Sequence, residues 1–382
     1  MYVIQNGTLY TMDGQGVIQA DLRLENGKIT EIGPNLSTEG AEVVDAAGKI
    51  VTPGFVDPHS HVGGFGDSSS TGQDLNEITN PLTPELDAYY GVDPTNKQFE
   101  VALAQGITTS CLVPGSANVV CGWGFALKSA GKNRLLKRPV ALKAAMGINP
   151  KGCYGTKNKA PMTRMAIANL MRSYLRNVQE YMKKKADAGG DAEKMPPYDL
   201  GLEHGIPVLE KKIPLKVHSY MHDMMTVLEI AKEFDILVTL DHALGASDYY
   251  EELTDPHVHG VIFGPTAEPL FSGEGGKLDY ECCQGLDERG VNVAVMTDGP
   301  VTNVNMLLFE MGECVRRGMD PVRALALVTS NSAKIVGVED RVGSLTVGKD
   351  ADVLIWSKMP CIATDAILER VFLDGEMVFE EK

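Results

Sequence analysis

Short apolar runs separated by turns characterise both ends of the chain. Near the N-terminus such runs flank Asn6-Gly7 and Asn26-Gly27, and Asn-Gly between apolar runs is a strong hairpin signal. The C-terminal end shows the same pattern around Asp374-Gly375. We therefore expect one small β-domain built from the two termini, with the middle of the chain inserted between its halves.

The middle of the chain alternates runs of strand length with longer helical patterns. This alternation predicts parallel strand–helix units, and eight strands that are mostly followed by helices are typical of a TIM barrel. The longest helical pattern starts after Thr163, a suitable N-cap. The expected strands cover residues 50–61, 107–113, 122–128, 139–146, 213–218, 236–241, 258–263 and 291–297, and the expected helices cover 96–105, 163–185, 223–234, 247–253, 279–288, 304–317 and 321–330.

These patterns divide the chain into three segments. Residues 1–52 and 341–382 are expected to form the β-domain, and residues 53–340 the catalytic barrel. A chain of 382 residues suits a barrel of about 250 residues with an accessory domain.

Residues 63–94 form a long loop that is rich in Gly, Ser, Thr and Pro, and loops of that length usually cover a functional site. We expect this loop and the loop at 264–277 to shape the pocket.

Composition narrows the class of partner. Hydrophobic residues make up 43% and charged residues 23%, as in ordinary globular proteins. The net charge of -16 argues against a nucleic acid or an anionic membrane as partner and leaves a small-molecule substrate. The seven cysteines form no CxxC pair, and neither a signal peptide nor a membrane span is visible, which predicts a cytoplasmic protein with reduced thiols. A homo-oligomer is compatible with these features.

One expected strand carries two histidines that suit a metal. Residues 50–61 read IVTPGFVDPHSH and end in His59 and His61. Side chains alternate along a strand, so both imidazoles point the same way. Imidazole nitrogens are favoured ligands of zinc and similar divalent metals. The alternative is a pair of loop histidines without a ligand, and residues further along the chain favour the metal.

Matching side chains lie at or near the ends of later strands. His218 ends the fifth expected strand, His242 follows the sixth, Asp298 ends the eighth, and Lys143 lies in the fourth. A barrel brings the C-terminal ends of its strands onto one face. Three or four imidazoles and one carboxylate suit a catalytic divalent metal with an open position for water. The sequence thus predicts a metal centre, with zinc as the expected ion, formed by His59, His61, His218, His242 and Asp298.

Such a centre predicts hydrolysis. A divalent metal lowers the pKa of its bound water to about 7, which makes hydroxide available at neutral pH. Asp298 is the expected general base, which accepts the proton of that water and later returns it to a leaving amine. Either His242 or a second metal is expected to polarise the carbonyl and stabilise the developing oxyanion.

Several motifs resemble one enzyme superfamily. The segment PGFVDPHSH resembles the PGxxDxHxH signature of the amidohydrolases, and VHS, DHA, MTDGP and SLTVGKDADVLIW further along are similar to other motifs of that superfamily. The stretches TPELDAY, VPGSAN and KAAMGINPK followed by TRM resemble the imidazolonepropionase-related branch. The resemblance implies an α/β fold, with a distorted TIM (β/α)8 barrel beside a small β-sandwich domain built from both termini. It also implies a metal-dependent hydrolase, usually with zinc, and leaves the substrate unspecified.

The number of metals depends on two positions in the fourth strand–helix unit. Ile148 replaces the glutamate of the GENPK pattern typical of this branch, so that one metal is expected if that glutamate bridges two metals in relatives. The other route to two metals is a carbamate on Lys143, because a buried lysine loses its proton more easily and a neutral amine takes up carbon dioxide. The alternative for Lys143 is an outward-pointing side chain or one paired with an acid.

Residues near the fifth strand are candidates for substrate contacts. Tyr220 and Arg164 are suited to orienting a carboxylate or carbonyl, and His222 lies four residues after His218. A capping or surface role for His222, and an ordinary helix-surface role for Arg164, are equally compatible with the sequence. Asp57 precedes the histidine pair and suits a structural or orienting role better than a ligand role.

The leading hypothesis is therefore a metal-dependent amidohydrolase that cleaves an amide or cyclic amide C–N bond of a small metabolite. The first alternative is a deaminase of an aminated heterocycle. Deaminases of this superfamily usually carry a glutamate shortly after the fifth-strand histidine, whereas this chain has none and offers only His222 or Asp223 instead. The second alternative is a non-enzymatic homologue, which the retention of all five ligand candidates disfavours.

Overall fold

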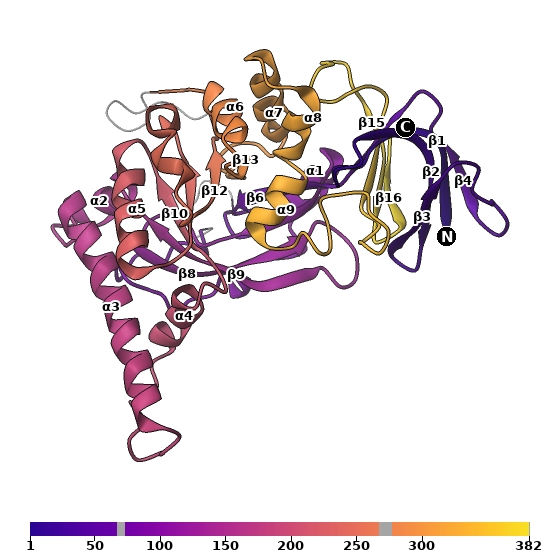
Figure 1. The fold of residues 1–382 in the computed structure, drawn as a ribbon. Coiled ribbons are helices and arrows are strands. Elements are labelled where there is room, and N and C mark those ends of the chain that lie inside the picture. The colour runs from indigo at the N-terminus through magenta and orange to yellow at the C-terminus, as the bar shows by residue number, and fades with distance from the viewer. Residues whose placement is uncertain (67–72, 267–276, 382) are drawn as a thin grey trace.

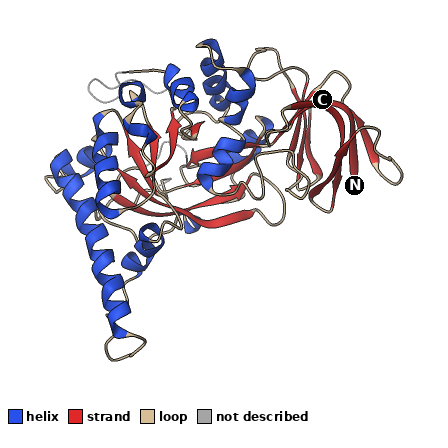
Figure 2. Cartoon of the chain, in the orientation of Figure 1, coloured by secondary structure: helices blue, strands red, loops and turns tan. Residues whose placement is uncertain are grey.

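The computed structural model describes residues 1–66, 73–266 and 277–381. Two eight-stranded sheets organise the chain, and helices cover the second of them (Figures 1 and 2). The first sheet lies at one end of the molecule and contains strands from both ends of the chain (Figure 1). Its strands are β1 (Tyr2–Tyr10), β2 (Val17–Glu25), β3 (Lys28–Gly33), β4 (Glu42–Asp45), β5 (Ile50–Pro53), β14 (Val353–Trp356), β15 (Leu368–Leu373) and β16 (Glu376–Glu380).

The second sheet follows the chain in order, from β6 at one edge to β13 at the other. Its two edges approach each other, since Asp298 N donates to His59 O at 3.2 Å and His61 N to Gly299 O at 2.6 Å. The sheet is thus nearly closed. Its strands are β6 (Phe55–Ser60), β7 (Ile107–Leu112), β8 (Val120–Lys128), β9 (Leu135–Ala145), β10 (Leu215–Ser219), β11 (Val238–His242), β12 (Val258–Phe263) and β13 (Val293–Val295).

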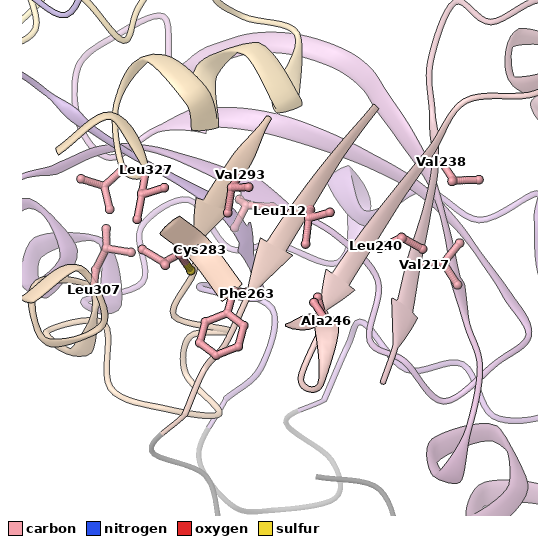
Figure 3. Packing of buried hydrophobic residues seen from close by; sticks show 14 of the residues in the cluster. Leu112, Val217, Val238, Leu240, Ala246, Phe263, Cys283, Val293, Leu307 and Leu327 are labelled. Atoms are coloured by element: carbon pink, nitrogen blue, oxygen red, sulfur yellow. The ribbon is translucent and has the colours of Figure 1, made fainter. Parts of the chain in front are cut away.

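Helices follow most of these strands and bury apolar side chains against them. Figure 3 shows Val217, Val238 and Leu240 on neighbouring strands within this core. The α-helices are α1 (Gln98–Ala104), α2 (Ile148–Gly155), α3 (Arg164–Ala188), α4 (Leu200–Leu209), α5 (His222–Phe234), α6 (Glu281–Glu288), α7 (Met306–Arg316), α8 (Pro321–Ala326) and α9 (Ser330–Val336), and short 3-10 helices are η2 (Ala88–Tyr90), η3 (Ala246–Tyr249) and η4 (Glu252–Thr254).

One expectation about this sheet is wrong. Strand β8 runs antiparallel to both β7 and β9, whereas all other strand pairs of the sheet are parallel. The connections are residues 113–119 and 129–134, which are too short for a crossover helix and therefore allow only hairpins. The barrel-like sheet thus departs from a regular run of eight parallel strand–helix units.

The helix predictions had mixed outcomes. Helix α3 is confirmed, with the hydroxyl of Thr163 accepting a hydrogen bond from Ala166 N. The expected helix at 247–253 is wrong, because η3 and η4 occupy that region. The expected helix at 321–330 ends early, and α9 follows it as a separate helix. Helices α2 and α4 were not predicted, because internal Gly and Pro residues obscure their pattern.

The Pro-Gly break in IVTPGFVDPHSH marks the passage from the first sheet to the second. Strand β5 ends at Pro53 and β6 begins at Phe55, so that Gly54 alone joins them. A Cβ at Gly54 would lie 2.1 Å from Thr108 Oγ1, which is far closer than atoms approach. The absence of a side chain here allows β6, which carries the histidine pair, to pack against β7.

The two sheets are held together by buried apolar and charged contacts. The rings of Phe55 and Trp356 are stacked, with centroids 5.6 Å apart. Lys128 of β8 is 1% exposed and forms ion pairs with Asp350, Asp352 and Asp374 near the C-terminal strands. Three carboxylates around one ammonium compensate the cost of burying it.

In the part of the chain that the structure describes, no helix is both long and apolar enough to cross a bilayer.

Candidate metal centre

The histidine pair lies at the end of β6, fully enclosed by the protein. His59 is 0% exposed and His61 2% exposed. His61 Nδ1 donates to Val113 O at 2.8 Å, and His59 Nδ1 lies 2.5 Å from Asp241 Oδ2. With both Nδ1 atoms engaged, the two Nε2 atoms face Asp298 Oδ1, at 3.3 Å from His59 and 3.0 Å from His61. These three side chains form a group with ligand atoms close enough to bind one metal ion.

The other two predicted histidines lie beside this group. His218 is in β10 and His242 ends β11, and their ring centroids are 4.0 Å apart. The His242 ring also lies 5.3 Å from the His59 ring. The parallel pairing of β10 with β11 explains this proximity, since Ser219 is the register partner of His242. The structure thus brings all five predicted ligand residues to one place.

The backbone is strained at two of these residues. His242 has φ 73° and Asp298 has φ 55°, both in the left-handed region that non-glycine residues seldom adopt. Such conformations cost about 1–3 kcal/mol each and persist where the surrounding structure enforces them. Each strained residue directs its side chain into the group from the end of its strand.

The unsatisfied atoms of the centre fit a divalent metal. Buried polar atoms without a hydrogen-bond partner include His59 Nε2, His218 Nδ1, both ring nitrogens of His242, and Asp298 Oδ1. Buried polar groups are nearly always paired, so a concentration of unpaired nitrogens and one carboxylate oxygen calls for a ligand. Imidazole nitrogen and carboxylate oxygen are the donors that zinc prefers.

The electrostatics of the centre keep His61, His218 and His242 neutral. Burial lowers the pKa of His61, and burial together with the neighbouring histidine lowers that of His218 further. Burial lowers the pKa of His242 to about 3. Burial raises the pKa of Asp298, but its contacts with His59 and His61 outweigh this effect and hold it well below the usual range. Neutral imidazoles and an ionised carboxylate are the protonation states required of metal ligands.

Lys143 points into the protein. It is 0% exposed, and its Nζ donates to Ser116 Oγ at 2.8 Å and to Ala144 O at 3.2 Å. Burial lowers the pKa of this lysine. The outward-pointing alternative is therefore wrong, and no carboxylate of a described residue forms an ion pair with Lys143. Lys143 is the register partner of Lys216 and therefore lies in the strand next to that of His218.

Asp241 was missed as a residue of the centre. Its Oδ2 atom accepts from His59 Nδ1 and lies 2.8 Å from Lys216 Nζ, while Oδ1 accepts from Thr239 Oγ1 at 2.9 Å. A carboxylate on Nδ1 fixes the ring and leaves the Nε2 lone pair for a ligand. The sequence signal was present, because Asp241 directly precedes His242.

Asp57 does not hold a ring of the histidine pair. Its carboxylate accepts from Thr297 Oγ1 at 2.5 Å, and burial raises its pKa to about 6.

The candidate substrate residues differ in their distance from the centre. The ring of Tyr220 lies 4.8 Å from that of His218 and 5.3 Å from that of His242. His222 is exposed at the first residue of α5. Arg164 Nε donates to Asp223 Oδ1 at 2.8 Å, which links the starts of α3 and α5. Tyr220 thus adjoins the histidines directly, whereas Arg164 pairs with Asp223 and His222 is exposed at the start of α5.

Asn149 is a further neighbour of the centre that sequence reasoning overlooked. Its Nδ2 atom lies 3.4 Å from His218 Nε2, at the second residue of α2. The adjacent Ile148 is 39% exposed. The amide of Asn149 therefore approaches His218 in the segment where the GENPK pattern of the related branch carries a glutamate.

Two loops were expected to shape the pocket. Residues 67–72 of the first loop and 267–276 of the second lie outside the described part of the chain.

Comparisons with known proteins agree with this geometry. Two amidohydrolase family models match residues 42–91 and 281–378. The structure is similar to that of an amidohydrolase from Thermotoga maritima, with 36% identity, a TM-score of 0.94 and complete coverage of both chains. An imidazolonepropionase from Geobacillus kaustophilus is 26% identical over 91% of this chain and 86% of its own length.

A fungal relative is longer. The amidohydrolase TasK of Hapsidospora irregularis is 26% identical over 94% of this chain, which spans only 40% of that protein. The Thermotoga structure, by contrast, is covered over its whole length. The chain belongs to the amidohydrolase superfamily, in its imidazolonepropionase-related branch, and is a hydrolase of C–N bonds.

Proposed function

We propose that the protein hydrolyses an amide or cyclic amide C–N bond of a small metabolite at the buried histidine–aspartate centre. The observation that carries the proposal is the position of Asp298, whose Oδ1 lies within 3.3 Å of the Nε2 atoms of both His59 and His61. His59, His61, His218 and Asp298 would hold a divalent metal, with zinc as the expected ion. When bound, such a metal supplies a water that is activated for attack at neutral pH.

The side chains then divide the remaining work. Asp298, ionised when the site is ready, accepts the proton of the attacking water and returns it to the leaving nitrogen. His242 has two unpaired ring nitrogens at the same centre and suits polarisation of the substrate carbonyl. Tyr220, whose ring adjoins His242 at 5.3 Å, suits orientation of the substrate. Burial of the whole group excludes bulk water and strengthens these interactions.

The contacts around α5 favour amide hydrolysis over deamination. Asp223 was the nearest carboxylate that could replace the proton-shuttling glutamate of deaminases. Its Oδ1 atom is paired with Arg164 at 2.8 Å, so this carboxylate serves to join two helices. Convergence of the four proposed ligand residues and His242 likewise supports a catalytic rather than a purely structural role for the centre.

A substrate panel tests the proposal. Purified protein with zinc is assayed on N-acyl amino acids, lactams and imidazolones, and in parallel on aminated heterocycles. We expect cleavage of an amide or lactam, and a loss of turnover by orders of magnitude in Asp298→Asn. Asp340→Asn, at an exposed position outside the centre, is the matched control and should retain turnover. Ammonia release from the heterocycles alone would refute amide hydrolysis, and full activity of Asp298→Asn would refute the role of Asp298.

A further inference from the structure

A cavity of about 800 Å³ lies between the chain that follows β6, the start of β8 and the start of α4. Its wall includes chain segments that flank the metal centre, although none of the five ligand candidates lines it. Gly63, two residues after His61, lines it, and so does Gly115, two residues after the Val113 carbonyl that holds the His61 ring. Its remaining wall includes Trp123 and His204. None of these features has a part in the chemistry described above.

One buried imidazole in the wall presents an unpaired nitrogen. His204 is 6% exposed, and its Nδ1 donates to Pro84 O at 2.8 Å. Burial lowers the pKa of His204, so the ring is neutral and Nε2 carries a lone pair. No hydrogen bond from the rest of the described chain reaches Nε2. His204 Nε2 is therefore an acceptor without a protein donor on the wall of the cavity, and it can accept a hydrogen bond from a ligand that donates.

The His204 ring is held rigidly by an aromatic neighbour. It stacks on Trp123 with centroids 3.6 Å apart and an interplanar angle of 12°. Trp123 Nε1 in turn donates to His204 O at 3.1 Å. Tyr90 contributes a third aromatic ring to the lining. Aromatic faces attract cations, most strongly when the cation is partly removed from water.

The charge of the lining is strongly negative. Five carboxylates line the cavity against one cation, Arg138, whose guanidinium is neutralised by Asp87 at 2.8 Å. No described residue forms a hydrogen bond or ion pair with the side chains of Asp74 and Glu85. These groups are acceptors, as is His204 Nε2. The lining carboxylates are Asp74, Glu77, Glu85, Asp87 and Asp93.

Arg138 shows how a guanidinium is accommodated on this wall. Its Cζ atom lies 4.3 Å from the ring centroid of Tyr89 and 4.9 Å from that of Tyr90, in addition to the pair with Asp87. Aromatic faces and a carboxylate thus already bind one guanidinium at the edge of the cavity. Trp123, His204 and Glu85 offer the same combination to a second one.

We propose that this cavity binds an ammonium or guanidinium group of a small ligand. Glu85 and its neighbouring carboxylates neutralise the charge, His204 Nε2 accepts one N–H, and Trp123 packs against the group. Because the wall of the cavity includes Gly63, two residues from His61, we expect the protein to prefer amides that carry a basic group. That preference rests on the proposed function, whereas binding of the cation does not.

Binding can be measured without turnover. The chain contains two tryptophans, so Trp356→Phe leaves Trp123 as the fluorescent reporter in the wall. The probes are n-butylguanidinium chloride and the neutral, equally shaped n-butylurea. We expect saturable binding of the guanidinium that is at least about tenfold tighter than that of the urea. Because Trp356 is buried, calorimetric titration of the unsubstituted protein provides the same comparison if Trp356→Phe does not fold.

Two variants locate the binding. Glu85→Gln should weaken guanidinium binding by about tenfold, while Glu193→Gln, which removes the same charge from an exposed loop outside the cavity, should leave it unchanged. Equal affinity for the two probes, equal behaviour of the two variants, or no saturable binding would overturn the inference.

The two proposals fail separately. A protein that binds n-butylguanidinium but hydrolyses no amide refutes the proposed function and leaves the cation site. An active amidohydrolase whose KM for basic amides is unchanged by Glu85→Gln, and which binds n-butylurea equally well, refutes the cation site alone.

Discussion

The substitution Asp241→Asn separates the role of this carboxylate in positioning His59 from its role in stability. Asp241 is 0% exposed and lies 2.5 Å from His59 Nδ1 and 2.8 Å from Lys216 Nζ. Asparagine preserves the shape and removes the charge. The variant therefore weakens the hold on the His59 ring and also leaves the ammonium of Lys216, which is 2% exposed, without its counter-ion.

Both effects have expected magnitudes. Loss of a carboxylate that orients a metal-binding imidazole typically lowers metal affinity about 10–100-fold, or roughly 1.4–2.7 kcal/mol. Loss of one partner of a buried ion pair costs about 3–5 kcal/mol of folding stability. We expect zinc affinity, measured by competition with a chromophoric chelator, to fall by that factor. Urea unfolding of the metal-free protein should report the loss of stability.

Lys216→Met is the matched control, because it breaks the same ion pair and leaves Asp241 on His59. It should lose stability to a similar degree while it retains zinc affinity. If Asp241→Asn binds zinc as tightly as the unsubstituted protein, or if Lys216→Met loses the same affinity, Asp241 does not position the ligand and acts only in stability.

Three further predictions concern other parts of the molecule. Gly54→Ala should destabilise the protein by about 1–3 kcal/mol in urea unfolding, because the new Cβ meets Thr108. The control Gly152→Ala, which has open space around it in α2, should not destabilise the protein. Equal effects of the two variants would exclude the clash with Thr108 as the cause. Burial raises the pKa of Glu310 from 4.5 to about 7, so the folded state retains its proton longer, and Glu310 should contribute a loss of about 3 kcal/mol to the stability of the metal-free protein as pH rises from 4.5 through 7. Glu310→Gln should remove that loss, and an unchanged pH profile would contradict the assignment. Because Ile148 stands where the related GENPK pattern carries a glutamate, elemental analysis should find one zinc per chain, unchanged in Lys143→Met. Two metals, reduced to one by that variant, would indicate a carbamate instead.

The convergence of the five candidate side chains could be predicted because it follows from periodicity and topology. Alternation along β6 places His59 and His61 on the same side, and parallel strands bring their C-terminal ends to one edge. His218, His242 and Asp298 are each at or just beyond the end of such a strand. Residue type and position at a strand end were therefore sufficient to place five side chains together.

The positioning residue was not predictable in the same way. Asp241 contacts His59, which lies in a strand that is not its neighbour in the sheet. Sequence spacing gives no measure of such a distance. Asp57, only two residues from His59, was the natural candidate, yet its carboxylate is directed to Thr297. Which of two buried carboxylates reaches an imidazole depends on strand packing rather than on proximity in the chain.

Strand direction and short helices also escaped prediction. The apolar run of β8 is the same whether it runs parallel or antiparallel, and only the short connections on either side restrict the choice. Helix α4 contains Gly201, Gly205 and Pro207, which are unfavourable for helix formation in isolation. Tyr174 explains one of them: a Cβ at Gly205 would lie 2.7 Å from its hydroxyl. Tertiary packing here overrides local propensity.

The most direct test of the account is the metal dependence of C–N bond hydrolysis at the histidine–aspartate centre. The protein is purified, its zinc is removed with a chelator, and amide or lactam cleavage is measured before removal, after removal and after addition of zinc. We expect activity to disappear with the metal and to return in proportion to zinc bound, while His61→Ala neither binds zinc at this centre nor recovers. A protein that contains no transition metal and keeps full activity in the chelator would contradict the central claim.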